Sequence, residues 1–541
     1  MFLRPALPLV LLSVISLHAQ SVWQATTNKT WSTSGNWSGG VPNSDTAIAQ
    51  FGATSQPDVN VTGTLTVDRI EFTADAPAYT FAHKNGSTLT LSGDGIVNAS
   101  SATQTFELKS NKDAAARIAF VNSASAGNAA ISAQGTSTYS GLIDFSDTSS
   151  AGTAQLKLLK YGSITFDGTA TAANAKITFQ DTGSVVTFQG ASTAASAEIS
   201  VTADGSLVFS DYSSAGFAKL LATYAPETNA RTAPAQISFT GNATADSATI
   251  DSTRLDFSGS ASAGNATLTL RGATYFKDSS TAGSATLYMT GGGGLTFSDQ
   301  SSLGSANVIL SNSAGIKFEG NATAGTGVIS GVGSLHVDTD GTFILSGEHT
   351  YSGTTKVTDG QLVVNGSLPN TEMVEVFHSK TLGGSGTIGG LVALHPFARL
   401  DPGDSVGTLT IAGGLLLTGY SIVNFELGTQ SDLIRLTGGT FSYAPIGGNP
   451  VTLNLFNSGG FDAGTYTLID FTTGDVELSN IDINNFILGT IIEGFDYSLA
   501  FTDDALRLIA TSTAIPEPST YAAFFGLVAL GFCVFRKRRA R

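Results

Sequence analysis

A short unit recurs ten times along the middle of the chain, and this repetition constrains the fold more than any other feature. Each copy begins with a phenylalanine: Phe120, Phe145, Phe166, Phe188, Phe209, Phe239, Phe257, Phe276, Phe297 and Phe318. The longest interval, between Phe209 and Phe239, contains an insertion at residues 224–234 that we expect to be a loop. A short, repeated period of this kind indicates an array of stacked units rather than one globular core.

The residues at fixed distances from each phenylalanine describe the unit. An aliphatic residue lies two positions before the phenylalanine in nine copies, and another lies eleven positions after it in all ten. Gly, Asp or Asn lies two positions after it, and Ala lies six and nine positions after it in nine copies each. Apolar residues two apart on either side of a turn-forming segment predict two or three short strands per unit, joined by turns.

Such units are typical of a parallel β-solenoid, in which each strand pairs with its copies in the neighbouring coils. We therefore predict an all-β fold, a right-handed parallel β-helix with coils of about 21 residues, over residues 118–335. The phenylalanines would stack as one interior ladder, and the alanines would mark places where the interior is narrow. An antiparallel barrel is the alternative, but it predicts hairpin turns between alternating strands rather than one decapeptide on one period.

The composition excludes several classes of function. Charged residues make up only 13% of the chain, and its one cysteine, Cys533, rules out disulfides and zinc sites built on two cysteines. Without the two terminal segments described below, the body contains 20 basic and 41 acidic residues. Such a body lacks the clustered Lys and Arg that nucleic acids require. It would also need divalent cations to bind anionic lipid or polysaccharide electrostatically.

The N-terminal segment, residues 1–19, has the parts of a secretory signal peptide. Arg4 precedes an apolar run at residues 6–17, and the small residue Ala19 stands at the expected cleavage point. A buried N-terminal helix is the alternative, but Pro5 and Pro8 interrupt the segment. We therefore expect residues 1–19 to direct export and then to be removed.

The last segment, residues 511–541, combines three features in order. Pro516, Glu517 and Pro518 come first, and an apolar run follows at positions 519–535. A basic cluster then closes the sequence: Arg536, Lys537, Arg538, Arg539 and Arg541. The apolar run is at the short end of what spans a bilayer, and the basic cluster would act as a membrane stop on the cytoplasmic side. We therefore predict one C-terminal transmembrane helix, with the body outside.

These three features resemble the PEP-CTERM sorting signal of Gram-negative bacteria. The resemblance implies an exported protein at the cell surface or outside the cell. It also implies processing by an exosortase, a membrane enzyme thought to cut near the Pro-Glu-Pro motif. A plain tail anchor, which would keep its helix permanently, is the alternative.

Two further regions flank the repeats. Residues 20–117 hold all three tryptophans, Trp23, Trp31 and Trp37, which would cap the open end of a solenoid or, alternatively, stack on sugar rings.

Residues 336–510 form the second flanking region. Within it, residues 341–366 resemble one autotransporter-associated β-strand repeat, and this resemblance implies a β-helical passenger. Residues 420–510 are too few for the outer-membrane barrel of true autotransporters, so self-translocation is not implied.

Motifs that carry chemistry are sparse. The segment from Gly384 to Gly389 formally fits a dinucleotide fingerprint, but it opens no helix of a βαβ unit. The segment from Asp338 to Gly341 resembles the start of a calcium loop, but His349 stands where the loop needs a glutamate. The histidines have no metal-binding spacing, and we expect them at the surface or in turns. We therefore predict no cofactor, no metal, and no catalytic or cofactor-binding residues.

A polysaccharide-active β-helix enzyme, a lyase or glycosidase, is the alternative function. It would need carboxylates clustered on one face, and aspartates do occur two positions after four of the phenylalanines: Asp147, Asp211, Asp278 and Asp299. Because Gly or Asn fills this position in the other copies, we interpret it as a turn position. The sequence favours a secreted, non-enzymatic β-helical protein with a structural or adhesive role. Its expected partners are an exosortase and extracellular polysaccharide or neighbouring surface proteins, and not nucleic acid.

Overall fold

The computed structural model describes residues 19–538, apart from residues 85, 203, 223–233, 312–313 and 514–517. The signal peptide before Ala19, nearly all of the insertion at residues 224–234, Pro516, Glu517 and the segment 539–541 lie outside the described part. The chain divides into two compact units. Unit 1 runs to Phe343 and includes residues 349–353, and unit 2 contains residues 344–348 and everything from Thr354 onward.

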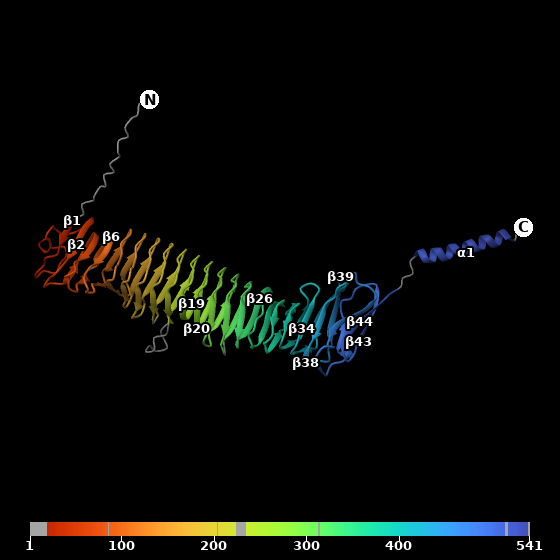
Figure 1. Ribbon diagram of the computed structural model, residues 1–541. Helices are drawn as coiled ribbons and strands as arrows, with labels where there is room; N and C mark the ends of the chain where they lie inside the picture. The colour runs from red at the N-terminus through yellow and green to blue at the C-terminus, as the bar shows by residue number, and fades with distance from the viewer. Residues whose placement is uncertain are drawn as a thin grey trace, which may run out of the picture. The chain divides into compact units, whose positions relative to one another are not determined.

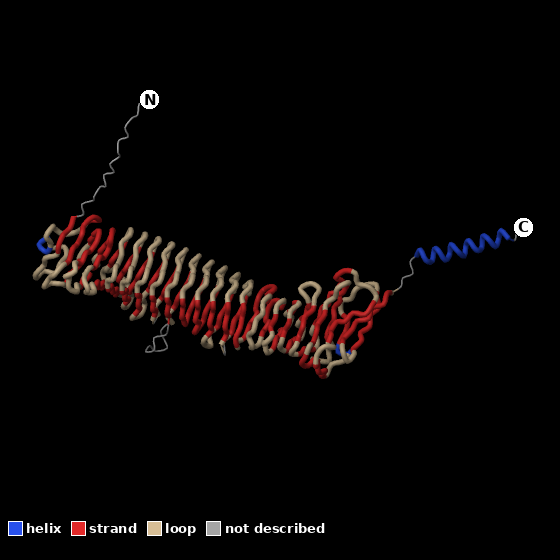
Figure 2. The backbone as a smooth tube through the Cα atoms, in the orientation of Figure 1, coloured by secondary structure: helices blue, strands red, loops and turns tan. Residues whose placement is uncertain are grey.

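Unit 1 is a parallel β-solenoid, whose coils follow one another in Figures 1 and 2. Its first sheet contains the strands that carry the repeat phenylalanines and the strands stacked on them: β4 (Thr64–Phe72), β6 (Thr88–Asn98), β8 (Arg117–Phe120), β10 (Gly141–Phe145), β12 (Gly162–Phe166), β14 (Val185–Phe188), β16 (Ser206–Phe209), β18 (Gln236–Phe239), β19 (Thr249–Phe257), β20 (Thr267–Phe276), β22 (Gly294–Phe297), β24 (Gly315–Gly320) and β26 (Ser334–Leu345). Each strand pairs in parallel with its neighbours one coil away; Phe145, for example, lies opposite Phe120 and Phe166. The predicted parallel β-solenoid, with coils of about 21 residues, is confirmed.

The second sheet of unit 1 uses the strands that follow each turn segment. Its members are β3 (Asp58–Val61), β5 (Thr80–His83), β7 (Thr105–Lys109), β9 (Ala130–Gln134), β11 (Gln155–Leu158), β13 (Lys176–Phe179), β15 (Glu198–Val201), β17 (Lys219–Ala222), the first halves of β19 and β20, β21 (Thr286–Met289), β23 (Asn307–Leu310) and β25 (Val328–Gly331). In these strands apolar residues alternate with polar ones, so that one side faces the interior and the other faces solvent.

The third side of each coil is a single residue wide. Isolated parallel bridges connect a column of serines and threonines, which we call the hydroxyl column: Ser125, Ser150, Thr171, Thr193, Ser214, Thr244, Ser262, Thr281, Ser302 and Thr323. In most coils the hydroxyl oxygen accepts a hydrogen bond from the backbone N–H two residues later, as Ser262 does from Gly264 at 3.0 Å. Each such hydroxyl thus closes the turn that follows it.

The interior of unit 1 contains the predicted ladder. Neighbouring rings from Phe120 to Phe318 have centroids 4.6–5.0 Å apart and planes within 12° of each other. All ten rings are fully buried. Ala263 and Ala266, which lie six and nine positions after Phe257, are also fully buried, so the interior is too narrow there for larger side chains.

The N-terminal end of unit 1 is closed by aromatic side chains. It is built from β1 (Ala19–Val22), the short 3-10 helix η1 (Ser34–Asn36) and β2 (Ser44–Phe51). Trp23, Trp31 and Trp37 are 0–3% exposed, and Trp37 lies 5.1 Å from Trp23 and 5.0 Å from Trp31 between ring centroids. Because the indoles are buried against one another, they cannot stack on sugar rings.

Unit 2 continues the parallel stacking within its own bounds. Its principal strands are β27 (Thr355–Val364), β29 (Met373–Val376), β30 (Thr381–Gly384), β32 (Leu391–Leu394), β33 (Arg399–Pro402), β35 (Gly414–Thr418), β36 (Ile422–Gly428), β38 (Gly438–Ala444), β39 (Val451–Gly459), β41 (Asp475–Ser479) and β42 (Phe486–Leu488), and the 3-10 helix η2 (Ile483–Asn485) precedes β42. A separate sheet contains β28 (Ser367–Leu368), β31 (Thr387–Ile388), β34 (Thr408–Ile411), β37 (Leu433–Leu436), β40 (Gly464–Asp470), β44 (Ala505–Ser512) and β43 (Phe495–Phe501). In this sheet β44 pairs antiparallel with β40 and β43, a departure from the parallel pattern.

The chain ends in the helix α1 (Pro518–Arg538). None of the helices in the described part of the chain is long and apolar enough to cross a membrane, which corrects the prediction of a transmembrane helix. The apolar run occupies only positions 519–535. The helix has 21 residues, but this apolar run is at the lower limit of what spans a bilayer.

Candidate functional site

The sorting segment is the most specific functional feature of the sequence, and the structure describes only part of it. Pro518 begins α1, whereas Pro516, Glu517, Arg539 and Arg541 lie outside the described residues. The backbone of Lys537 and Arg538 continues the helix, and the side chain of Arg536 is exposed.

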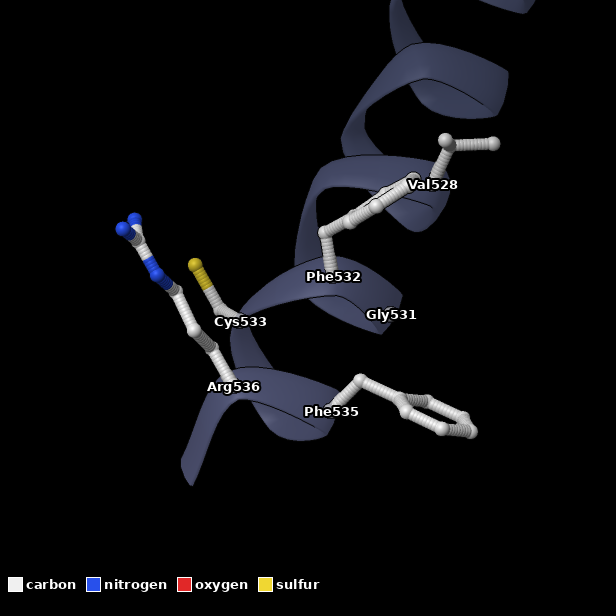
Figure 3. A pocket seen from close by; sticks show the side chains of 6 residues that line it. All are labelled: Val528, Gly531, Phe532, Cys533, Phe535 and Arg536. Carbon is white, nitrogen blue, oxygen red and sulfur yellow. The ribbon is translucent and has the colours of Figure 1, made fainter. Parts of the chain in front are cut away.

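The end of α1 presents its side chains to solvent. Figure 3 shows Phe535 and Arg536 pointing away from the helix, and Phe532 and Phe535 are 74% and 76% exposed. Cys533 is a free, exposed thiol. Because the surrounding residues all belong to this single helix, they form an open apolar surface and no enclosed cavity.

The aspartates that follow the phenylalanines take part in turn formation. Asp147, Asp211, Asp278 and Asp299 all have φ between 56° and 60°, a left-handed conformation that Asp and Asn tolerate better than most residues. Each carboxylate accepts a backbone N–H from the preceding coil, as Asp278 does from Gly259 at 2.8 Å. Their geometry therefore agrees with the turn interpretation rather than with a catalytic cluster.

A polar cleft in unit 2 is the strongest candidate for an enzyme site. It has a volume of about 350 Å³ and lies beside β33 and β36, and its lining includes Asp401, Glu426, Asp432, Asn424 and Phe456. No cationic side chain belongs to the described lining of this cleft. Within the described residues, moreover, no three His, Cys, Asp or Glu side chains are placed so that they could hold a metal ion.

Two carboxylates of this cleft, those of Asp401 and Asp432, are held by structural hydrogen bonds. Asp432 is 2% exposed and accepts the backbone N–H groups of Gly407 at 2.9 Å and Glu426 at 2.7 Å. Burial outweighs these bonds and raises the pKa of Asp432 to about 6. Asp401 accepts a hydrogen bond from the Asn424 side chain at 2.7 Å, and burial raises its pKa as well. Asp432 thereby ties the bend at residues 403–407 to β36.

Two histidines lie in the interior, where the sequence did not predict them. His83 and His349 are 2% and 1% exposed, and burial lowers the pKa of each to about 4. The Nδ1 atom of His349 accepts the backbone N–H of Ile329 at 3.3 Å, which requires the neutral ring. These histidines therefore support the coil structure rather than act as exposed bases.

The two weak motifs also have structural roles. Asp338 lies within β26 and forms an ion pair with Lys317 at 2.8 Å. Gly384 ends β30 with φ of 110°, and its N–H donates to the carbonyl of Gly403. The glycine segment thus forms a tight turn between strands.

The hydroxyl column is a feature that the sequence analysis did not identify. The sequence does contain a pattern that predicts this column, because Ser or Thr lies five positions after every one of the ten phenylalanines. The buried histidines and the cleft had no such local signal.

Comparison with known proteins agrees with this description. Residues 514–539 match the model of the PEP-CTERM protein-sorting motif. The adhesin BmaC autotransporter of Brucella suis biovar 1 (strain 1330) is 33% identical over 133 residues, 24% of this chain and 4% of the adhesin. An extracellular serine protease of Serratia marcescens is 35% identical over 99 residues, 18% of this chain and 9% of the protease.

Among solved structures, that of the Haemophilus influenzae Hap adhesin matches remotely. The match has 13% identity and a TM-score of 0.23, and it covers 86% of this chain and 59% of the adhesin chain. The chain spans only small parts of its two sequence relatives, 4% of the Brucella adhesin and 9% of the Serratia protease. It carries a PEP-CTERM protein-sorting motif after a β-solenoid body, and this motif implies exosortase processing and export to the cell surface or beyond.

Proposed function

We propose that the secreted body acts as a structural or adhesive element at the cell surface or in the extracellular matrix. The observation that carries this proposal is the regular solenoid of unit 1, which repeats the same polar turn residues coil after coil. Such an array presents many weak contacts at fixed spacing, and multivalency turns weak contacts into firm attachment. The partial likeness to an autotransporter adhesin is in keeping with this role.

The test compares cells that produce the full chain with cells that lack it. We expect producing cells to be retained better by extracellular matrix and by one another. Cells producing the Phe257→Ala variant, in which the interior ladder is broken, should lose much of this retention. Equal retention of producing and non-producing cells would contradict an adhesive or structural role.

The enzymatic alternative rests on the polar cleft with Asp401, Glu426 and Asp432. A reducing-end release assay on a panel of acidic polysaccharides tests it directly. We expect no turnover by the purified chain. Robust turnover that disappears in the Asp432→Asn variant would replace the adhesive proposal with a polysaccharide-cleaving enzyme.

A further inference from the structure

A groove of about 510 Å³ lies on the outer side of the second sheet of unit 1, over β7, β9, β11 and β13. Its shape follows from side-chain size. The small residues Ala130 and Ser132 on β9 stand in register between longer side chains, with Glu107 beside Ser132 on β7 and Gln155 beside Ala130 on β11. The groove is therefore a consequence of the register between strands of successive coils.

The charge of this groove differs from that of the body around it. Its lining contains Lys109, Lys157, Lys176 and one acidic residue, Glu107, which pairs with Lys109 at 2.9 Å. Lys157 and Lys176 are exposed, and neither forms an ion pair with any described residue. Glu198 lies opposite Lys176 in register, but it forms an ion pair with Lys219 at 3.3 Å.

Neutral hydrogen-bonding groups separate these cations. Lys176 stands beside Gln155, and Lys157 stands beside Thr178, on adjacent strands. Because neighbouring strands are about 4.8 Å apart, a linear ligand that crosses them meets polar groups at regular steps. None of the described residues that line the groove is aromatic, so it lacks the stacking platforms that single-stranded nucleic acids use.

We propose that this groove binds an acidic polysaccharide, with ligand carboxylates at Lys157 and Lys176 and ligand hydroxyls at the amides of Gln155 and Gln180. The inference rests on the proposed adhesive function, because it names the ligand class of that function. It also changes the expectation from overall charge: this surface binds a polyanion without divalent cations, although the body as a whole is acidic.

The experiment measures binding of the full chain to polygalacturonate in the presence of EDTA, by affinity electrophoresis at low and moderate salt. We expect saturable binding that weakens with salt because the ion pairs are exposed. The Lys157→Gln/Lys176→Gln variant should bind about tenfold more weakly, because it removes both exposed cations that pair with the ligand carboxylates. Neutral dextran should not bind.

A matched double variant controls for total charge. Lys29→Gln/Lys277→Gln removes two exposed lysines outside the groove and should keep the affinity within about twofold. Both variants retain the basic C-terminal cluster, so its contribution cancels. Equal weakening in the two variants, a need for divalent cations, or equally tight binding of an oligothymidine strand would each overturn the inference. The purified protein could fail to bind polygalacturonate while producing cells are still retained on matrix. That result would overturn the proposed ligand of the groove and leave the proposed adhesive function intact.

Discussion

At the scale of single residues, the buried ladder and the buried histidines determine how the stability of unit 1 responds to substitution and to pH. Each inner ring of the ladder lies between two others at van der Waals distance, so the loss of one ring leaves a cavity with little room for collapse. The histidines lie in an interior that disfavours the charged ring. Both features lead to stability predictions.

Phe257→Ala should lower the free energy of unfolding by about 3–5 kcal/mol, because it opens a cavity in the middle of the ladder. Ala266→Leu should lower it by about 1–3 kcal/mol through overpacking. The control is Phe217→Ala, whose side chain is 73% exposed; it should change stability by no more than about 0.5 kcal/mol. Denaturant unfolding of the full chain measures all three. If Phe257→Ala behaves like Phe217→Ala, the ladder does not stabilise the solenoid.

Acidification should weaken unit 1 through His349. Its pKa is about 4 in the folded chain, against an ordinary value of 6.5, so between these values the unfolded chain binds a proton that the folded chain does not. The stability contribution is therefore complete above pH 6.5 and decreases as the pH falls toward 4, by about 2 kcal/mol at pH 5. Burial lowers the pKa of His83 in the same way, so acidification should also weaken the fold through His83.

Denaturant midpoints at pH 7.5 and pH 5 measure this effect. In His349→Asn the difference between the two midpoints should shrink, whatever the cost of the substitution itself. The exposed His378 provides the control, since His378→Asn should leave the difference as it is in the natural chain. An unchanged difference in His349→Asn would show that this histidine does not control the pH response.

At the scale of the secondary-structure element, the turn after each phenylalanine strand varies in sequence from coil to coil. Asp, Asn and Gly replace one another there without changing the fold, because all three tolerate positive φ and the Asp carboxylate adds a hydrogen bond to the preceding coil. Three residues further along, the hydroxyl column closes the next turn by accepting a backbone N–H of the same coil. The solenoid is thus held by side-chain bonds between and within turns as well as by its two sheets.

This exchange of residues predicts an order of stability among substitutions at Asp278. Asp278→Ala should lower the free energy of unfolding by about 1–2 kcal/mol, because alanine adopts φ of 56° unfavourably and offers no acceptor to Gly259. Asp278→Gly loses the same acceptor but has no steric cost, so it should be less damaging. Thermal unfolding of the two variants measures this order of stability. A glycine variant that is less stable than the alanine variant would contradict the role of the positive φ.

At the scale of the whole molecule, the sorting segment and the body have opposite charge and separate roles. Processing near the Pro-Glu-Pro motif would remove the basic cluster of the tail and Cys533, and leave an acidic body. This change is large enough to follow by mass and by thiol labelling.

We expect the protein recovered from the native surface to lack Cys533. Replacement of Pro516, Glu517 and Pro518 by alanine should leave the chain uncut, as should production in a host without the sorting enzyme. Intact mass and thiol labelling measure both outcomes. Recovery of surface protein that still contains Cys533 would refute processing and favour a permanent tail.

The period of the coils, the inward phenylalanines, the turn positions and the sorting motif could all be predicted from the sequence, because each of these depends on residues close together in the chain. Which residues of different coils meet could be seen only in the folded chain. The burial of His349, the cleft at Asp432 and the groove floored by Ala130 and Ser132 all depend on register between strands of successive coils. Inter-coil register brings such residues to within about 4.8 Å, and no local pattern records it. The helix α1 shows the reverse case, because its apolar run suggested a membrane span that its length does not support.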